Sequence, residues 1–198
     1  VVIHMRYNID DLSFIFPKKV DFKKLSTKKA LTPFSKEVIH FLDDFSKEIL
    51  SNFSVKDYPD LITLGFFCRK ANIIHLKNKH LNNNELRLGV GLLFHIAPSN
   101  VAVNFAYSLI TGLLAGNSNI VRVSSVLFEQ VNIISKVLEE ISNNIIHEKI
   151  LSRIILVRYN KQSNITEYFS SICDARLIWG GDDTINQIRK NKLSPRSF

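Results

Sequence analysis

The sequence has few of the features that mark secreted or membrane proteins. It contains two cysteines in 198 residues, Cys68 and Cys173, which indicates a reducing compartment and no disulfide framework. No stretch reaches about 18 consecutive apolar residues, the length that a transmembrane helix needs. Residues 1–11 are charged and lack the sustained apolar region of a signal peptide. We therefore expect a cytoplasmic protein with no membrane span.

Short ligand-binding signatures are also scarce. Gly89-Val-Gly91 stands at the start of a predicted strand and not in the turn after it, so it is not a Gly-x-Gly-x-x-Gly phosphate-binding fingerprint. His75 and His80 are five positions apart and do not share a helix face, so we predict no metal site. His95 lies beside a predicted loop, where we interpret it as a structural residue.

Basic residues exceed acidic ones, and the formal net charge is +8. Part of the excess lies near the N-terminus, in Lys18, Lys19, Lys23, Lys24, Lys28 and Lys29. A nucleic-acid-binding arm is one interpretation, but no base-reading module follows the run, so we favour a solvated face and expect no nucleic-acid partner. A basic chain also suits an anionic ligand such as a nucleotide or coenzyme A.

The most informative stretch runs from Leu88 to Ser125. A continuous apolar run, Val90–Ile96, predicts a strand buried on both faces. Val101–Leu114 recurs at helical spacing and ends at Gly116-Asn117, and the β-branched segment Ile120–Val123 predicts a second strand. These elements form a β-α-β unit, and ligands of open α/β sheets bind at the carboxyl ends of such strands.

The remainder of the chain extends the same alternation. The pattern predicts a helix from Leu127 to Ile141, a strand over Ile154–Val157, a helix over Ser163–Ile172, a strand over Arg176–Trp179 and a helix over Asp182–Lys190. This order argues for an α/β fold with a parallel, Rossmann-like sheet covered by helices.

The part before residue 85 is predicted to be mainly helical, with short strands or loops over Val1–Leu31. Thr32 or Ser35 can cap a helix that runs to about Asn52, and a second helix opens at Asp57-Tyr-Pro59 and continues to Ala71 or Leu76. The polar stretch Lys77–Glu85 predicts a loop. We expect an N-terminal segment at residues 1–85 and a dinucleotide-binding α/β domain at residues 86–198.

Three motifs in this order resemble the acyl-CoA reductase family, which includes the long-chain fatty acyl-CoA reductase of bacterial bioluminescence. They are His95-Ile-Ala-Pro-Ser-Asn100, Leu113-Leu-Ala-Gly-Asn-Ser-Asn-Ile-Val-Arg-Val-Ser-Ser125 and Ile178-Trp-Gly-Gly-Asp182. The family belongs to the aldehyde dehydrogenase superfamily, so the resemblance implies an aldehyde dehydrogenase-like cofactor-binding domain.

The resemblance assigns a catalytic role to one residue of the first motif. Pro98-Ser99-Asn100 matches the superfamily's Pro-Trp-Asn, with Ser99 in place of the aromatic residue. The superfamily's Asn donates to the oxyanion formed on the substrate, so the resemblance implies that role for Asn100. Without the resemblance, an Asn that closes a turn is the simpler interpretation. Pro98 and Ser99 are expected to contact the cofactor.

The resemblance places the other cofactor contacts on the second and third motifs. The superfamily's Lys falls on Arg122, which is expected to contact the adenosine ribose. Its following Ser and Glu fall on Ser124 and Ser125. The Thr-Gly-Ser turn of the superfamily falls on Trp179-Gly180-Gly181, where only backbone donors remain for a phosphate. A tight turn with no ligand is the alternative interpretation of Gly180 and Gly181.

The function implied is NADPH-dependent reduction of a fatty acyl-CoA or acyl-protein thioester to the aldehyde through a cysteine acyl-enzyme. The chain would be the cofactor-binding half, with the nucleophilic cysteine in a missing C-terminal catalytic domain, because neither Cys68 nor Cys173 matches the superfamily's nucleophile motif. We expect a homo-oligomer for the full-length enzyme. The alternatives are a non-catalytic nucleotide-binding or interaction module and a basic nucleic-acid-binding domain.

Overall fold

The computed structural model describes residues 11–18, 20, 22–81, 85–160, 164–195 and 197 of the 198. Several predictions concern residues outside the described part of the chain. They are residues 1–10, which were expected not to form a signal peptide, Lys19 of the basic run, residues 82–84 of the predicted loop and Ser163 at the start of a predicted helix. The side chain of Lys23 is also outside this part.

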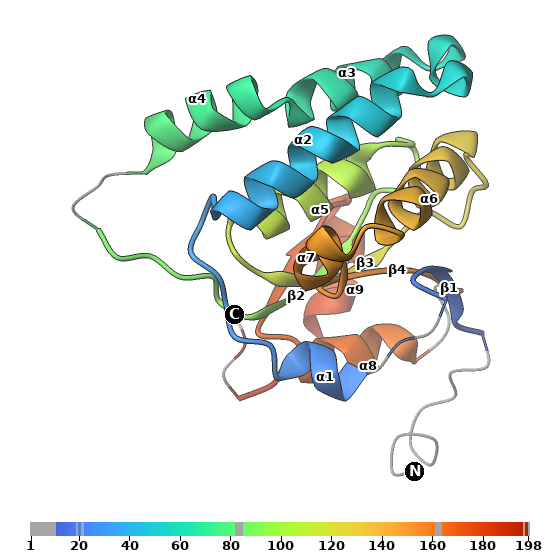
Figure 1. The fold of residues 1–198 in the computed structure, drawn as a ribbon. Coiled ribbons are helices and arrows are strands. Elements are labelled where there is room, and N and C mark those ends of the chain that lie inside the picture. Colours follow the sequence, from blue (N-terminus) through green and yellow to red (C-terminus); the bar gives the residue numbers. More distant parts are fainter. Residues whose placement is uncertain are drawn as a thin grey trace.

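The described part of the chain folds around a five-stranded sheet with the strand order β1-β4-β3-β2-β5 (Figure 1). The strands are β1 (Ser13–Phe16), β2 (Leu92–Ile96), β3 (Ser118–Arg122), β4 (Ile154–Arg158) and β5 (Ala175–Ile178). The pairs β4–β3, β3–β2 and β2–β5 are parallel. The predicted parallel α/β sheet is therefore confirmed, and each of its four predicted strands begins and ends within two residues of the expected positions.

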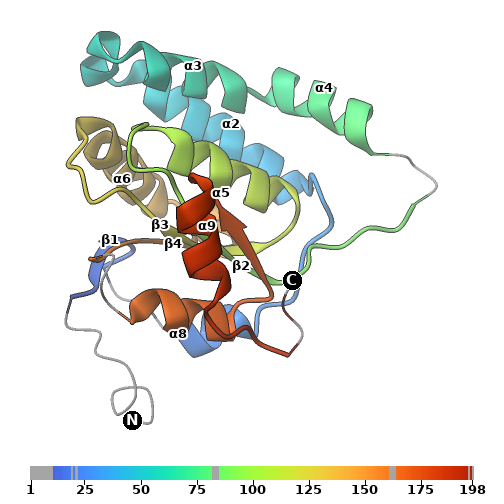
Figure 2. The same ribbon diagram turned by 180° about the vertical axis from the view of Figure 1, so that it is seen from behind.

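Helices cover both faces of the sheet, as Figures 1 and 2 show from opposite sides. One face packs against α5 (Asn104–Leu114) and α6 (Glu129–Ser142), with α2 (Lys36–Ser51), α3 (Pro59–Cys68) and α4 (Lys70–His80) in a layer beyond them. The other face packs against α1 (Phe22–Ser26) and α8 (Ile165–Ile172). The last helix, α9 (Asp182–Arg189), follows β5. Coverage on both faces explains why β2 and β3 are continuous buried runs.

Strand periodicity sends alternate side chains of β2 and β3 into separate cores. Phe94 and Ile120 pack with the α8 layer, whereas Val121 packs with α5 and α6. Gly116 ends α5 in a left-handed conformation with φ 87°, which confirms the predicted stop. Gly91, with φ 127°, lies just before the amino end of β2. This position agrees with the prediction that Gly89-Val-Gly91 precedes the strand and is not in the turn after it.

The N-terminal part is helical, as predicted, but its details differ. The helix capped by Ser35 is present, with the Ser35 side chain accepting from the Val38 N–H. The second predicted helix is in fact two, α3 and α4, because Arg69 between them adopts an extended conformation with ψ 136°. The predicted start of the loop at Lys77–Glu85 is wrong, because α4 continues to His80.

Four short elements were not predicted, and the first is α1, which lies where short strands or loops were expected. A 3₁₀ turn, η1 (Phe53–Asp57), joins α2 to α3, and η2 (Ile145–His147) and α7 (Glu148–Leu151) follow α6. Strand β1 pairs antiparallel with β4, so the sheet is mixed at that edge. None of the helices in the described part of the chain combines the length and hydrophobicity needed to cross a bilayer.

Candidate functional site

The predicted site residues lie in loops that leave neighbouring strands at one edge of the sheet. β2 ends at Ile96, which pairs in register with Arg122 at the end of β3 and with Ile178 at the end of β5. The loops at residues 97–100, 123–125 and 179–181 therefore start side by side. This carboxyl edge is the usual binding position in open α/β sheets.

The loop after β2 exposes Asn100. Pro98 is half-buried, whereas Ser99 and Asn100 are exposed between the end of β2 and the start of α5. The backbone of the loop is tied to its neighbours, since the Ala97 N–H donates to the Arg122 carbonyl at 3.2 Å. An exposed amide on an anchored loop can face a group bound at the edge.

Ser124 joins the first two loops. Its hydroxyl donates to the Ser99 carbonyl at 3.1 Å and accepts from the Val126 N–H at 3.0 Å. The residue is buried, in contrast to Ser125, which is exposed. Ser124 therefore fixes the spacing of the loops, and Ser125 is the serine that faces outward.

Arg122 lies beneath the edge rather than on it. Its side chain is buried, one Nη donates to the Tyr159 carbonyl at 3.3 Å, and the guanidinium carbon lies 4.9 Å from the centroid of the Tyr159 ring. Its Nε has no hydrogen-bond partner among the described residues. Burial lowers the pKa of Arg122 from its usual value, and a buried cation with an unsatisfied donor is stabilised by an anion nearby.

Arg158 is a second cation at this edge, and none of the three sequence motifs contains it. It ends β4, it is partly exposed, and its Nε donates to the Ser124 carbonyl at 3.0 Å. Burial lowers the pKa of this arginine as well. The only sequence signal was an arginine at the end of a predicted strand, and its proximity to Ser124 required the register of β3 and β4.

Gly180 and Gly181 form an exposed turn between β5 and α9. A Cβ on Gly181 would meet no atom within 4 Å, and one on Gly180 would lie 3.3 Å from Thr184. The space above Gly181 is thus open to a ligand, and no packing contact within the described part of the chain needs a glycine there. Asp182 and Asp183 occupy the first turn of α9.

A buried polar network supports this turn. The Trp179 indole N–H donates to the Ser108 hydroxyl at 3.2 Å, Ser108 lies 2.8 Å from His95 Nδ1, and His95 Nε2 lies 3.0 Å from the Asn119 Oδ1. Asn119 uses its amide nitrogen for the Asn117 carbonyl, so its oxygen accepts and His95 Nε2 carries the proton. His95 Nδ1 then accepts from Ser108, and every group in the network is satisfied with a neutral histidine.

Burial lowers the pKa of His95 to about 4, which agrees with a neutral imidazole in this network. The prediction that His95 is structural fits its complete burial between β2 and α5, whereas Asn100 is exposed. Its position still matters for the site, because it holds Trp179 through Ser108.

The two thiols of the chain are buried. Burial raises the pKa of Cys68 well above the usual range of a thiol, and it raises the pKa of Cys173 to about 11. Cys68 is at the end of α3 and Cys173 follows α8, so neither is at the carboxyl edge with Asn100. Both remain protonated at neutral pH and are poor nucleophiles there.

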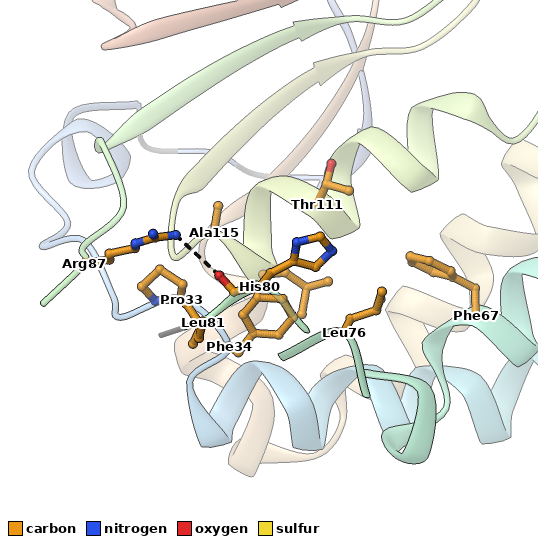
Figure 3. A pocket seen from close by; sticks show the side chains of 10 residues that line it. Pro33, Phe34, Phe67, Leu76, His80, Leu81, Arg87, Thr111 and Ala115 are labelled. Carbon is orange, nitrogen blue, oxygen red and sulfur yellow. Dashed lines mark hydrogen bonds between the residues drawn. The ribbon is translucent and has the colours of Figure 1, made fainter. Parts of the chain in front are cut away.

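A pocket of about 430 Å³ lies elsewhere, between α4, the end of α5 and the segment at Pro33 and Phe34 (Figure 3). It is mostly apolar, and Arg87 at its rim donates to the His80 carbonyl at 3.4 Å. Because it contacts the last residues of α5, it is at the opposite end of that helix from Asn100. It is separate from the predicted cofactor edge.

Residues 71–197 match the family model described as acyl-CoA reductase (LuxC). The chain belongs to the acyl-CoA reductase family. The matched segment includes the loops at Asn100, Ser125 and Gly181, and it begins within α4. No curated protein matches the sequence.

Solved structures confirm the fold of this acyl-CoA reductase family member. It is similar to an aldehyde dehydrogenase from Bartonella henselae, with 17% identity, a TM-score of 0.54, and coverage of 85% of this chain and 39% of that one. It is also similar to an NAD-dependent benzaldehyde dehydrogenase from Corynebacterium glutamicum, with 14% identity, a TM-score of 0.59, and coverage of 96% and 50%. The chain thus spans half or less of the length of these structures, and it has the aldehyde dehydrogenase-like fold.

Proposed function

We propose that the chain is the cofactor-binding half of an enzyme that reduces a fatty acyl-CoA thioester to the aldehyde with NADPH. The observation that carries the proposal is the convergence of the three family motifs on the carboxyl edge of the sheet. The edge combines an exposed amide, an open glycine turn and the partly exposed Arg158, and Arg122 is buried beneath it. These groups suit a dinucleotide with negative phosphates.

The residues present fit NADPH on two structural observations. Arg122 has a buried donor with no partner among the described residues, and Gly181 leaves open space at the amino end of α9. When bound, NADPH supplies the hydride. Gly180 and Gly181 would let the backbone approach the phosphates, while Arg122 and Arg158 would supply positive charge to the cofactor.

The preference for NADPH over NADH rests on Ser125. An acidic residue at this position would hydrogen-bond a ribose 2′-hydroxyl and repel a 2′-phosphate. Ser125 is exposed and neutral, and Arg158 is bonded to the backbone of the adjacent Ser124. Both features favour the phosphorylated ribose.

Asn100 is proposed to donate its side-chain amide to the developing oxyanion of the acyl group. Its loop is fixed by the Ser124–Ser99 bond, so the amide is held ready and not reorganised during the reaction. Pro98 and Ser99 would contact the cofactor from the same loop. The nucleophilic cysteine would come from outside residues 1–198, since Cys68 and Cys173 are buried and protonated.

The remaining proposals concern the whole protein. We propose a domain boundary near residue 85, an acyl-CoA or acyl-protein thioester as the acyl donor, a homo-oligomer for the full-length enzyme and a location in the cytoplasm. The competing proposal is a non-catalytic nucleotide-binding or interaction module built on the same sheet, because the edge alone explains cofactor binding without any chemistry.

Acyl-CoA-dependent NADPH oxidation by the full-length enzyme decides between the two. An Asn100→Ala variant should reduce turnover by about a hundredfold or more while NADPH affinity stays unchanged. The control is Asn143→Ala, an exposed asparagine beyond the end of α6, which should keep full activity. Normal turnover by Asn100→Ala would return Asn100 to a turn-forming role, and no oxidation by the wild type would support the non-catalytic module.

A further inference from the structure

Three metal-ligating side chains meet on the helical layer, away from the carboxyl edge. His40 and Asp44 are one turn apart on α2 and share a face of that helix. His147 ends η2, 103 residues beyond Asp44. Because His147 is far from the other two residues in the chain, no local spacing in the sequence marks this group.

The ligand atoms converge on one carboxylate oxygen. His147 Nε2 lies 3.0 Å from Asp44 Oδ2, His40 Nε2 lies 3.4 Å from the same oxygen, and one ligand atom from each residue lies within 4.8 Å of the other two. Two ligands bound tetrahedrally to Zn²⁺ at about 2.0–2.1 Å lie about 3.3 Å apart. The observed separations require shifts of a few tenths of an ångström for Asp44, and a rotation of the exposed His40 ring to close the third side.

The three side chains are held in different ways. The His147 side chain is 3% exposed and packs edge-on against Phe41 with ring centroids 5.7 Å apart. The Asp44 and His40 side chains are 27% and 54% exposed. The buried His147 is a rigidly held ligand. The exposed His40 leaves an entry path for an ion and room for water as a fourth ligand.

Lys47 limits and orients the group. Its ammonium bonds Asp44 Oδ1 at 2.8 Å and Asp43 Oδ2 at 2.9 Å. Asp44 Oδ2 faces both imidazoles and is hydrogen-bonded to His147 Nε2, and a bound ion would take the place of the shared proton. The positive charge of Lys47 weakens attraction for a cation, and Asp43 partly offsets it, so the site should bind with moderate affinity.

We infer that His40, Asp44 and His147 form a Zn²⁺ site that joins η2 to α2, with water completing the coordination. Two imidazoles and one carboxylate suit borderline metals such as Zn²⁺, whereas Mg²⁺ and Ca²⁺ prefer oxygen ligands throughout. The site is independent of the proposed cofactor binding. It would fix the turn after α6 onto the outer helical layer.

The test is titration of the purified 198-residue chain with Zn²⁺, and with Co²⁺ as a spectroscopic probe. One Co²⁺ per chain should bind with the absorption of a tetrahedral site, and Zn²⁺ should displace it and raise the melting temperature. His40→Gln should weaken binding at least about tenfold. Because the His40 side chain is mostly exposed, this variant should fold normally.

The matched control is His75→Gln, an exposed histidine on α4, which should bind like the wild type. Asp44→Asn keeps the size of the side chain and should also weaken binding. The proposal is overturned if the wild type binds no ion, if His40→Gln and Asp44→Asn bind as tightly as the wild type, or if His75→Gln loses the ion.

Discussion

His95 couples the stability of the fold to pH. The imidazole is neutral in the folded state, because burial lowers its pKa from 6.5 to about 4 and Ser108 donates to Nδ1. The unfolded chain gains a proton below pH 6.5, so the contribution of His95 is complete above that pH and is lost as the pH falls to about 4. At about 1.36 kcal/mol per pH unit, the loss reaches about 3 kcal/mol.

A His95→Gln variant isolates this effect. Gln can still donate to Asn119 but cannot titrate, so the free energy of unfolding should depend less on pH between 6.5 and 4 than in the wild type. Urea unfolding at several pH values measures the difference. Parallel curves for the two proteins would show that His95 is not the titrating group.

Two glycines should respond in opposite ways to alanine. A Cβ on Gly91, at φ 127°, would lie 2.2 Å from the Asp174 carboxylate, so Gly91→Ala should destabilise the fold by more than about 1 kcal/mol. Gly181 has φ −71° and open space around its Cβ position. Gly181→Ala should change the free energy of unfolding by less than about 0.5 kcal/mol and still weaken NADPH binding.

Denaturant unfolding and NADPH titration of the same two variants separate the roles. If Gly181→Ala binds NADPH like the wild type, the backbone of this turn does not approach a phosphate, and the turn-only interpretation of Gly180 and Gly181 is correct.

Arg122 should distinguish the two cofactors. An Arg122→Met variant keeps apolar contact with the Tyr159 ring but removes the charge. The loss of affinity should be at least about tenfold greater for NADPH than for NADH, because hydrogen bonds to charged groups are stronger than those to neutral groups. Titration of both cofactors measures this ratio, and Lys136→Met, at an exposed lysine of α6, serves as a charge control. Equal losses of affinity for NADPH and NADH would show that Arg122 does not bind the 2′-phosphate.

A buried hydroxyl of α2 bonds the backbone of α3. Ser46 Oγ donates to the Gly65 carbonyl at 2.7 Å, and both residues are buried. Ser46→Ala leaves that carbonyl unsatisfied and should cost about 1–3 kcal/mol of the free energy of unfolding. Ser51→Ala, where the hydroxyl only bonds Glu48 of its own helix, should cost much less. Similar losses in denaturant unfolding would show that the Ser46 bond does not join the helices.

Sequence patterns located the elements that are buried on a regular face, and failed where distant contacts decide. β2 and β3 were predictable because both faces of the sheet are covered and the runs are continuously apolar. The break at Arg69 was not, because no Gly or Pro marks it. The Lys70 N–H instead donates to the Asp43 carboxylate of α2 at 3.1 Å, and this contact exists only in the folded chain.

The same limit applied at the candidate site. The loops at Asn100, Ser125 and Gly181 could be predicted from short motifs at strand ends. The burial of Arg122 beneath Tyr159, the Arg158 contact with Ser124 and the meeting of His40 with His147 could not, because each depends on residues far apart in the sequence.

At the scale of the whole molecule, residues 1–198 should lack reductase activity by themselves. The nucleophile of the proposed reaction is a thiolate, and both thiols of this chain are buried with raised pKa values. The purified chain should show no acyl-CoA-dependent NADPH oxidation above a Cys68→Ala, Cys173→Ala double variant. Turnover by the wild type that disappears in a folded double variant would place the nucleophile in this chain.

The central claim, that this chain binds NADPH at the carboxyl edge, is tested most directly by the fluorescence of its single tryptophan. Trp179 immediately precedes Gly180 and is half exposed at the proposed site. Titration with NADPH should change its emission in a saturable way, at lower concentrations than titration with NADH. No saturable change with either cofactor, in a chain that circular dichroism shows to be folded, would contradict the claim.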